Sequence, residues 1–169
     1  KEILETQPEI KDGHLNGQTE IKGKIEFKDV SFTYSKTNQT VLKHINLTIN
    51  PGETIAMMGA TGCGKTTLAY LISRFYDVSE GSVLVDGIDV RDYPLQVLRE
   101  KIGMVLQKSE LFSESIKDNI SWGLKNASDE KIYEAACIAQ ADEFIQTTPH
   151  GYDTFVAERG TSLSGGQKQ

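Results

Sequence analysis

The sequence contains few cysteines, no surplus of basic residues and no long apolar run. Only Cys63 and Cys137 occur among 169 residues, so no disulfide framework is predicted and a reducing compartment is favoured. Lys and Arg number 18 against 24 Asp and Glu, and the net charge of −6 argues against nonspecific binding of nucleic acid, whose phosphates attract basic surfaces. No apolar run approaches the roughly 20 residues that cross a bilayer, and residues 1–4 do not open a signal peptide. We therefore expect any membrane-spanning part to lie in other segments.

The composition is otherwise that of a globular domain of ordinary size. Hydrophobic residues make up 38% of the chain and charged residues 25%, and a chain of 169 residues is long enough to bury a core. Residues 1–22 are polar, carry both signs of charge and lack a sustained periodicity. This pattern predicts a linker that lies outside the core.

From Lys24 onward the pattern of apolar residues predicts strands. Alternation of apolar and polar residues indicates a half-buried strand, and a short continuous apolar run indicates a strand buried on both faces. The alternating segments are 24–34 and 45–49, the continuous runs are 54–58 and 101–107, and residues 82–90 predict two short strands around an Asp86–Gly87 turn.

Helical periodicity appears first over residues 65–76 and then dominates after residue 107. The apolar face of the first helix is formed by Leu68, Leu71, Ile72 and Phe75. Ser128 is the expected N-cap of a helix that runs to about Gln140, since Asp129 and Glu130 follow where the helix dipole favours anions. A short helix is predicted over 141–146. The chain is thus mixed α/β in its first part and mostly helical in its second.

The strongest motif is GATGCGKTT, residues 59–67, which matches the phosphate-binding pattern G-x-x-x-x-G-K-[ST] between a predicted strand and a predicted helix. Glycines at 59, 62 and 64 let the backbone turn sharply and point its N–H groups at a phosphate. Lys65 supplies a positive charge for the β- and γ-phosphates, and Thr66 supplies a hydroxyl for Mg²⁺. The alternative is a glycine-rich turn that a lysine follows by chance. The strand and helix on either side favour nucleotide binding.

Cys63 lies inside this motif, at the start of a helix and close to Lys65. Both features make a cysteine thiol more reactive toward electrophiles. We predict that thiol reagents modify Cys63 and that bound nucleotide protects it. The alternative is a small side chain that only fills space.

Four motifs in this order resemble the ATP-binding cassette (ABC) family, and specifically the nucleotide-binding domain of ABC exporters. They are Tyr34 in VSFTYS, the phosphate-binding loop, Gln107 in MVLQ, and the signature sequence LSGGQ at 163–167. The loop alone is common to many ATPases and GTPases, whereas the loop together with LSGGQ is specific. The resemblance extends from Lys24 to Gln169.

Each of these motifs also has a purely structural interpretation. Tyr34 is either an aromatic residue of strand packing or, as the resemblance implies, the ring that stacks on adenine. Gln107 is either a polar residue at a strand end or the side chain that touches Mg²⁺ and the attacking water, since ligands bind at strand ends in open α/β sheets. The sequence SLSGGQ alone is equally typical of a flexible loop with a serine N-cap.

Two further stretches favour an exporter. ELFSESIKDNI, residues 110–120, resembles the exporter segment that follows the glutamine, with Glu114 and Ser115 where many members have Gly and Thr. FVAERGTSLSGGQ, residues 155–167, resembles the loop that contacts the transmembrane part of the partner, with Ala157 in place of a common glycine. The lead-in ETQPEIKDG also looks like the linker after the last transmembrane helix of fused exporters.

The resemblance implies an α/β fold: a P-loop NTPase core with an antiparallel β-subdomain and a helical subdomain, incomplete at the C-terminus. The expected divisions are a linker over 1–22 from a preceding transmembrane domain, an ATP-binding core over 23–107, and a helical subdomain over 108–169.

The same resemblance implies the site residues. Lys65 and Gln107 would act in catalysis, and Thr66 and Gln107 would reach Mg²⁺. Contacts to ATP are expected from Tyr34, Val41, Gly59, Thr61, Gly62, Cys63, Gly64, Lys65, Thr66, Thr67 and Gln107. Ser164, Gly165, Gly166 and Gln167 would face the ATP held by a second nucleotide-binding domain in a head-to-tail dimer.

The implied function is ATP hydrolysis coupled to export, with a transmembrane domain fused upstream and a location at the cytoplasmic face of the plasma membrane. In the family, an acidic Mg²⁺-holding strand, a catalytic glutamate and a γ-phosphate histidine follow the signature. None of His14, His44 and His150 matches that histidine, and we expect this segment alone to bind nucleotide and hydrolyse it poorly. The alternatives are an importer ATPase, a non-transport ABC ATPase and a regulatory half-site of a heterodimeric exporter.

Overall fold

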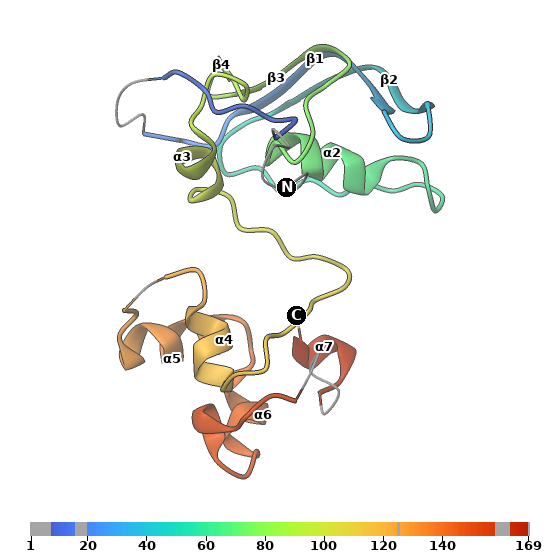
Figure 1. Cartoon of the computed structure of the whole chain (residues 1–169). Helices are drawn as coiled ribbons and strands as arrows, with labels where there is room; N and C mark the ends of the chain where they lie inside the picture. The colour runs from blue at the N-terminus through green and yellow to red at the C-terminus, as the bar shows by residue number, and fades with distance from the viewer. Residues whose placement is uncertain (1–7, 16–19, 125, 158–162, 169) are drawn as a thin grey trace, which may run out of the picture. The chain divides into compact units, whose positions relative to one another are not determined.

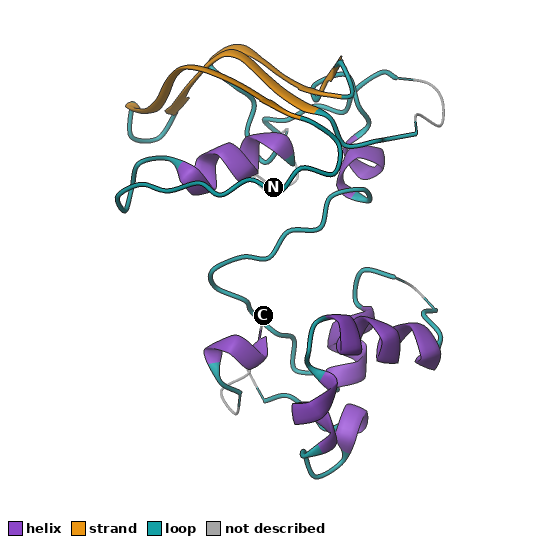
Figure 2. Cartoon of the chain, turned by 180° about the vertical axis from the view of Figure 1, so that it is seen from behind, coloured by secondary structure: helices purple, strands orange, loops and turns teal. Residues whose placement is uncertain are grey.

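The computed structural model describes residues 8–15, 20–124, 126–157 and 163–168. The chain divides into two compact units, Lys1–Gly103 and Met104–Gln169, each of which is described by itself. Figures 1 and 2 show the sheet in the first unit and the helices of the second.

The first unit is built on a four-stranded antiparallel sheet in the order β2-β1-β3-β4. The strands are β1 Ile25–Tyr34, β2 Gln39–Ile49, β3 Glu80–Val85 and β4 Ile88–Asp89. The predicted Asp86–Gly87 turn between β3 and β4 is confirmed: both residues have positive φ, 50° and 80°, as a type I′ hairpin turn requires. Strand β1 occupies the centre and pairs with both β2 and β3.

Helix α2, Lys65–Ile72, lies along one face of this sheet, and the shorter helix α3, Leu95–Arg99, completes the unit (Figures 1 and 2). The core between them consists of Phe27, Val30, Phe32, Leu42, Leu71, Val83, Val85, Val90, Tyr93 and Leu98. Helix α2 ends at Ile72, earlier than its apolar pattern predicts, and Phe75 is 43% exposed. The Arg99 guanidinium satisfies the C-terminal end of α2 by donating to the carbonyl oxygens of Ser73 and Arg74.

The prediction of strands at the two continuous apolar runs is wrong. Residues 54–58 and 101–107 form no strand, and most of their apolar side chains are exposed, to 95% at Met58 and 76% at Val105, whereas Ile102 and Met104 are half-buried. A strand buried on both faces needs a neighbour on each side and cover above and below. Within the described part of the chain neither run has a partner strand, so the apolar pattern alone does not make it one.

The lead-in to the first strand makes specific contacts with the first unit. The Asp86 carboxylate accepts hydrogen bonds from the N–H groups of Lys22, Gly23 and Lys24, at 2.6, 3.1 and 2.9 Å. Farther back, the Leu15 N–H donates to the carbonyl oxygen of Asp92 at 3.0 Å. The segment before β1 is therefore tied to the β3–β4 turn and to the loop that precedes α3.

The same region contains a close approach that only glycine allows. A Cβ on Gly13 would clash with the carbonyl oxygens of Asp92 and Tyr93. The neighbouring Asp12 carboxylate accepts from the first N–H of α3, that of Leu95, at 2.6 Å. An acidic side chain at this end of a helix also interacts favourably with the helix dipole.

We expect Asp86→Ala to lower the free energy of unfolding by about 2 kcal/mol at pH 7, because three N–H groups lose a charged acceptor. Burial raises the pKa of Asp86, but the hydrogen bonds from Lys24, Gly23 and Lys22 outweigh it and hold the pKa below its usual value. The stabilisation is therefore complete above the unfolded-state pKa of 3.8 and is lost as the pH falls through the lower native pKa.

Urea titrations at pH 7 and at pH 2 measure this effect, with exposed Asp92→Ala as the matched control. The difference between wild type and Asp86→Ala should shrink on acidification. A difference that is the same at both pH values would contradict the assignment.

The second unit is helical. Its elements are α4 Ile116–Ser121, α5 Asp129–Ile138, α6 Asp142–Gln146, the 3₁₀ helix η1 Gly151–Asp153 and α7 Gly165–Lys168. The predicted cap of α5 is confirmed, since the Ser128 hydroxyl accepts from the N–H of Lys131. The buried core of the second unit consists of Ile116, Ala136, Ile145 and Val156. Across the described parts of both units, no helix has the length and the apolar content that a membrane crossing requires.

Candidate functional site

The GATGCGKTT segment forms a tight loop that leads directly into α2. Gly62 and Gly64 have φ of 84° and 98°, a backbone region in which glycine meets no steric cost. The Cys63 N–H donates to the carbonyl oxygen of Ala60 at 3.2 Å and closes a turn inside the loop. A glycine at 59 leaves room for this fold-back, because a Cβ there would lie 2.6 Å from the Cys63 sulfur.

The loop presents unpaired backbone donors at the N-terminal end of α2. Among the described residues, the N–H groups of Gly64, Lys65 and Thr66 have no hydrogen-bond acceptor, and no side chain caps the helix. These groups carry the positive end of the helix dipole, and together they form the kind of backbone surface that binds phosphate. The exposed Thr66 side chain lies at the same helix start.

The Lys65 ammonium folds back over the loop. Its Nζ donates to the carbonyl oxygens of Gly59 and Ala60, at 2.8 and 3.0 Å, and contacts the Cys63 sulfur at 3.5 Å. The positive charge is thus held at the loop by neutral acceptors. An anionic phosphate is a stronger acceptor for an ammonium than a carbonyl oxygen is, and its arrival would replace bonds to neutral acceptors with bonds to an anion.

Val41 and Tyr34, two residues predicted to contact ATP, lie beside this loop. A Cβ on Gly64 would stand 3.0 Å from the Val41 Cγ1 atom, so β2 packs directly against the end of the loop. The hydroxyl of Tyr34, the last residue of β1, is 3.0 Å from the hydroxyl of Thr67 in the first turn of α2. The structure therefore brings Tyr34, Val41 and the loop together, as their predicted shared role requires.

Tyr34 also belongs to a cluster of aromatic rings that the sequence did not predict. Its ring makes edge-on contacts with Phe32 and Tyr76, with centroids 4.7 and 5.3 Å apart. Tyr34, Phe32, Phe75 and Tyr76 border a cavity of about 890 Å³, to which the lead-in contributes Glu9 and Ile10. The strand position of Phe32 was visible in the sequence, but Tyr76 lies past the end of α2 and had no signal of its own.

Gln107 and the signature residues belong to the second unit. Gln107 is exposed. Ser164 starts α7 with a reciprocal capping box: its N–H donates to the Gln167 side chain at 2.9 Å, and its hydroxyl accepts from the Gln167 N–H at 3.3 Å. Gly165 and Gly166 are exposed and have open space where a Cβ would stand. Glu158, Arg159 and Gly160 of the predicted partner-contacting loop lie outside the described residues.

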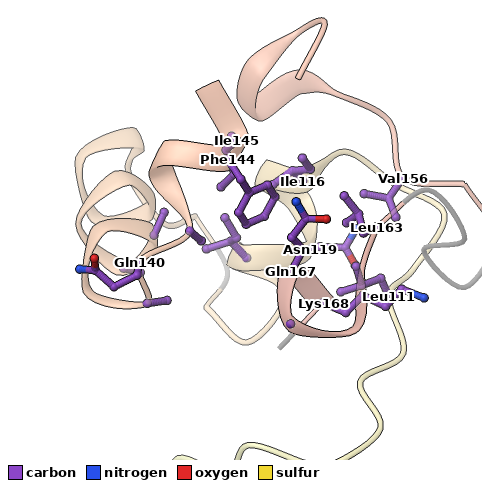
Figure 3. A pocket seen from close by; sticks show the side chains of 16 residues that line it. Leu111, Ile116, Asn119, Gln140, Phe144, Ile145, Val156, Leu163, Gln167 and Lys168 are labelled. Carbon is purple, nitrogen blue, oxygen red and sulfur yellow. The ribbon is translucent and has the colours of Figure 1, made fainter. Parts of the chain in front are cut away.

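An apolar cavity of about 460 Å³ lies among the helices of the second unit (Figure 3). The labelled side chains around it are Leu111, Ile116, Asn119, Gln140, Phe144, Ile145, Val156, Leu163, Gln167 and Lys168. Among the described residues that line this cavity there is no Asp, Glu, His or Cys. Its lining includes Gly166 and Gln167 of the signature sequence.

In the described residues of both units, no group of three or more His, Cys, Asp and Glu side chains could hold a metal ion. Mg²⁺ that accompanies a nucleotide does not need such a group, because phosphate oxygens and water supply most of its ligands. The protein ligand expected in the first unit is the Thr66 hydroxyl, whose exposed position at the loop suits this role.

A glycine-rich loop that opens a helix, with its lysine over the loop and an aromatic residue beside it, defines a P-loop nucleotide-binding domain. The family model described as ABC transporter matches residues 42–169. The chain therefore belongs to the ABC transporter family.

Named relatives and a solved structure agree with this assignment. The chain is 52% identical over 150 residues to a Bacillus subtilis (strain 168) protein named as a candidate multidrug export ATP-binding/permease protein, YgaD, covering 89% of this chain and 26% of that protein. It is 47% identical over 169 residues to a similarly named Staphylococcus aureus (strain NCTC 8325) protein, covering 99% of this chain and 29% of that protein.

A solved structure titled as a bacterial Atm1-family ABC exporter with ATP bound matches with a TM-score of 0.89 at 35% identity, covering 99% of this chain and 30% of that chain. The fold is therefore that of an ABC ATPase domain, with an antiparallel sheet and a helical unit. The chain spans less than a third of the length of each of these proteins.

Proposed function

We propose that this chain is the ATP-binding and ATP-hydrolysing domain of an ABC exporter, and that it couples ATP-driven head-to-tail dimerisation to the export of a substrate across a membrane. The observation that carries the proposal is the loop over 59–67, where unpaired N–H groups and the Lys65 ammonium converge at the start of α2. The family assignment and the likeness to an exporter structure that contains ATP support the choice of nucleotide.

Within the first unit, different residues are proposed to bind different parts of ATP. The N–H groups of Gly64, Lys65 and Thr66 and the Lys65 ammonium bind the phosphates by charge and geometry. Tyr34 offers its ring to the adenine base, and Val41 borders the end of the loop. The Thr66 hydroxyl would hold Mg²⁺, which would neutralise part of the phosphate charge.

Gln107 is proposed to orient the water that attacks the γ-phosphate, and Lys65 to stabilise the charge that develops there. The signature residues Ser164, Gly165, Gly166 and Gln167 are proposed to face the ATP of a second nucleotide-binding domain. The capping box fixes the Ser164 hydroxyl at the start of α7, and the two exposed glycines leave the backbone accessible.

The remaining partners follow from the relatives, which are named as ATP-binding/permease proteins. We propose a transmembrane domain fused upstream and a place at the cytoplasmic face of the plasma membrane. A regulatory half-site of a heterodimeric exporter is the second candidate, because the same loop and signature serve a domain that binds ATP and does not turn it over.

The two cysteines provide a direct test of ATP binding at the loop. Cys63 is exposed and in contact with the Lys65 ammonium, whereas Cys137 is half-buried on α5. We expect saturating Mg-ATP to slow the modification of Cys63 by a maleimide by about tenfold or more, because bound phosphate covers the loop and protected thiols react only from the unbound state. Mass spectrometry of the labelled peptides reads both sites at once.

Cys137 is the internal control, and its labelling rate should not change with nucleotide. Equal labelling of Cys63 with and without Mg-ATP would overturn the proposal for this loop. Equal slowing at both cysteines would show a general change in accessibility and would also count against it.

A further inference from the structure

Residues 9–15 form a strap, the lead-in strap, that is held against the first unit at three points. The Oδ1 atom of Asp12 accepts hydrogen bonds from the N–H groups of Gly13 and Leu95, at 3.1 and 2.6 Å. The Leu15 N–H donates to the carbonyl oxygen of Asp92 at 3.0 Å. Between these bonds, a Cβ on Gly13 would lie 2.2 Å from the same Asp92 oxygen. The strap is thus docked in a specific geometry on the loop that precedes α3.

The other end of the strap borders the cavity beside Tyr34. Glu9 and Ile10 line this cavity together with the ring of Tyr34, and Ile10 is half-buried. Ile10 and the docked Asp12 are two positions apart, which is at most about 7 Å along an extended chain. Release of Asp12 from α3 therefore also frees this wall of the cavity.

The strap is held by these polar contacts and not by the core. No residue in the described range 8–15 belongs to the hydrophobic core of the first unit, and Asp12 is exposed. A segment with few buried apolar contacts and exposed hydrogen bonds opens at a lower free-energy cost than the core does. The strap can therefore be released while the sheet and α2 stay folded.

The docked strap does not fill the cavity. A volume of about 890 Å³ remains beside it, which lies within the range of pockets that bind small molecules. Phe32 and Tyr76 meet the Tyr34 ring nearly at right angles, at 83° and 86°, and such edge-on contacts restrain a ring without stacking on its faces. The strap is a wall of this cavity and not a plug.

We propose that the lead-in strap closes one side of the pocket for the nucleotide base, and that docking of the strap and binding of the base strengthen each other. The inference rests on the proposed function, in which Tyr34 stacks on adenine. A base at Tyr34 then meets the wall formed by Glu9 and Ile10 only while the strap is docked. A ligand that gains contacts in one of two states shifts the protein toward that state, and the coupling acts equally in both directions.

The sign of the effect separates this role from autoinhibition. If the strap competed with the base for Tyr34, its release would strengthen the binding of Mg-ATP. If the strap is a wall, its release weakens the binding of Mg-ATP and leaves a ligand without a base unaffected. The second result is expected, because the cavity stays open beside the docked strap.

The first experiment is calorimetric titration with Mg-ATP and, separately, with inorganic tripolyphosphate. Asp12→Ala removes the acceptor that docks the strap, and Ile10→Ala shortens the wall and leaves the docking contacts in place. Each is expected to weaken Mg-ATP binding by about three- to fivefold, the effect of losing one hydrogen bond or part of one apolar contact. Neither should change the binding of tripolyphosphate.

Two further variants control for side effects of these substitutions. Asp12→Asn keeps a side-chain oxygen that can accept from the same N–H groups, and it should recover most of the Mg-ATP affinity. Glu20→Ala removes an exposed carboxylate from the lead-in outside the strap, and it should leave both affinities unchanged. Thermal unfolding of each variant checks that the first unit remains folded.

The second experiment, amide hydrogen exchange followed by NMR, tests the coupling in the opposite direction. The N–H groups of Leu15 and Leu95 become free to exchange when the strap is released. Saturating Mg-ATP should therefore slow their exchange by about threefold or more, and tripolyphosphate should not slow it. The N–H of Ile132, which donates to Ser128 in the second unit, is the internal control and should respond to neither ligand.

Three results would each overturn the inference: tighter binding of Mg-ATP by Asp12→Ala, equal losses for Mg-ATP and tripolyphosphate, or exchange at Leu15 and Leu95 that Mg-ATP leaves unchanged. Failure of the proposed function gives a different pattern. In that case the unaltered chain binds neither ligand, or binds Mg-ATP no better than tripolyphosphate, while Asp12→Ala still speeds exchange at Leu15 in the ligand-free chain.

Discussion

Replacing Lys65 with alanine is expected to weaken Mg-ATP binding by about 100-fold, because a charge-assisted bond to phosphate is lost from a site built around that charge. In the structure the ammonium reaches two carbonyl oxygens of its own loop, so it is already in position when a phosphate arrives. Displacement of a fluorescent ATP analogue measures the change.

The matched control is Lys43→Ala, which removes an exposed lysine of β2 and the same amount of net charge. Its affinity should differ from wild type by less than about twofold, since an exposed charge outside the site acts only at long range and is screened by salt. Equal losses in the two variants would show that net charge and not the loop governs binding.

Among alanine substitutions of the loop glycines, Gly64→Ala is expected to lower the stability of the protein most. A φ of 98° is strained for any residue with a Cβ, and that Cβ would lie 2.8 Å from Leu42 and 3.0 Å from Val41. We expect the free energy of unfolding to fall by about 3 kcal/mol, about 1 from the strained backbone and the rest from overpacking. Urea titration followed by circular dichroism measures it.

Gly62→Ala separates the two causes. Gly62 has a similar φ of 84°, but a Cβ there would meet nothing within 4 Å. Only the backbone cost of about 1 kcal/mol should remain at this position. If both variants lost the same stability, the close packing of β2 against the end of the loop would not be the cause.

Features fixed by local chemistry were predicted well from the sequence. The Asp86–Gly87 turn, the Ser128 cap and the start of α2 depend on residues within a few positions of one another. Turn geometry, capping and helical periodicity act at this range. The order of strands first and helices afterwards could therefore be predicted from the pattern, whereas the antiparallel sheet was implied only by the family resemblance.

Features that depend on distant partners were not predictable in the same way. The apolar runs at 54–58 and 101–107 have the composition of buried strands, yet a strand forms only where another strand pairs with it, and none of the described residues does so. The bond between Tyr34 and Thr67 joins two elements that periodicity treats separately. The polar sequence before β1 did not indicate that its backbone N–H groups would donate to the Asp86 carboxylate.

For the site itself, the loop motif carried most of the information. The residue types at 59–67 predict the conformation of the loop, because glycine is needed where φ is positive and lysine where phosphate lies. Tyr34 and Val41 could be assigned only by resemblance, and the structure places both beside the loop. The roles of these residues in binding ATP stay predictions, as do those of Gln107 and the signature in the second unit.

The central claim, that the loop of the first unit binds ATP, is tested most directly by calorimetric titration of the unaltered chain with Mg-ATP. The account predicts saturable binding of one nucleotide per chain, with the affinity lost in Lys65→Ala and retained in Lys43→Ala. Absence of saturable heat at millimolar Mg-ATP from a folded chain, or binding that Lys65→Ala leaves unchanged, would contradict it.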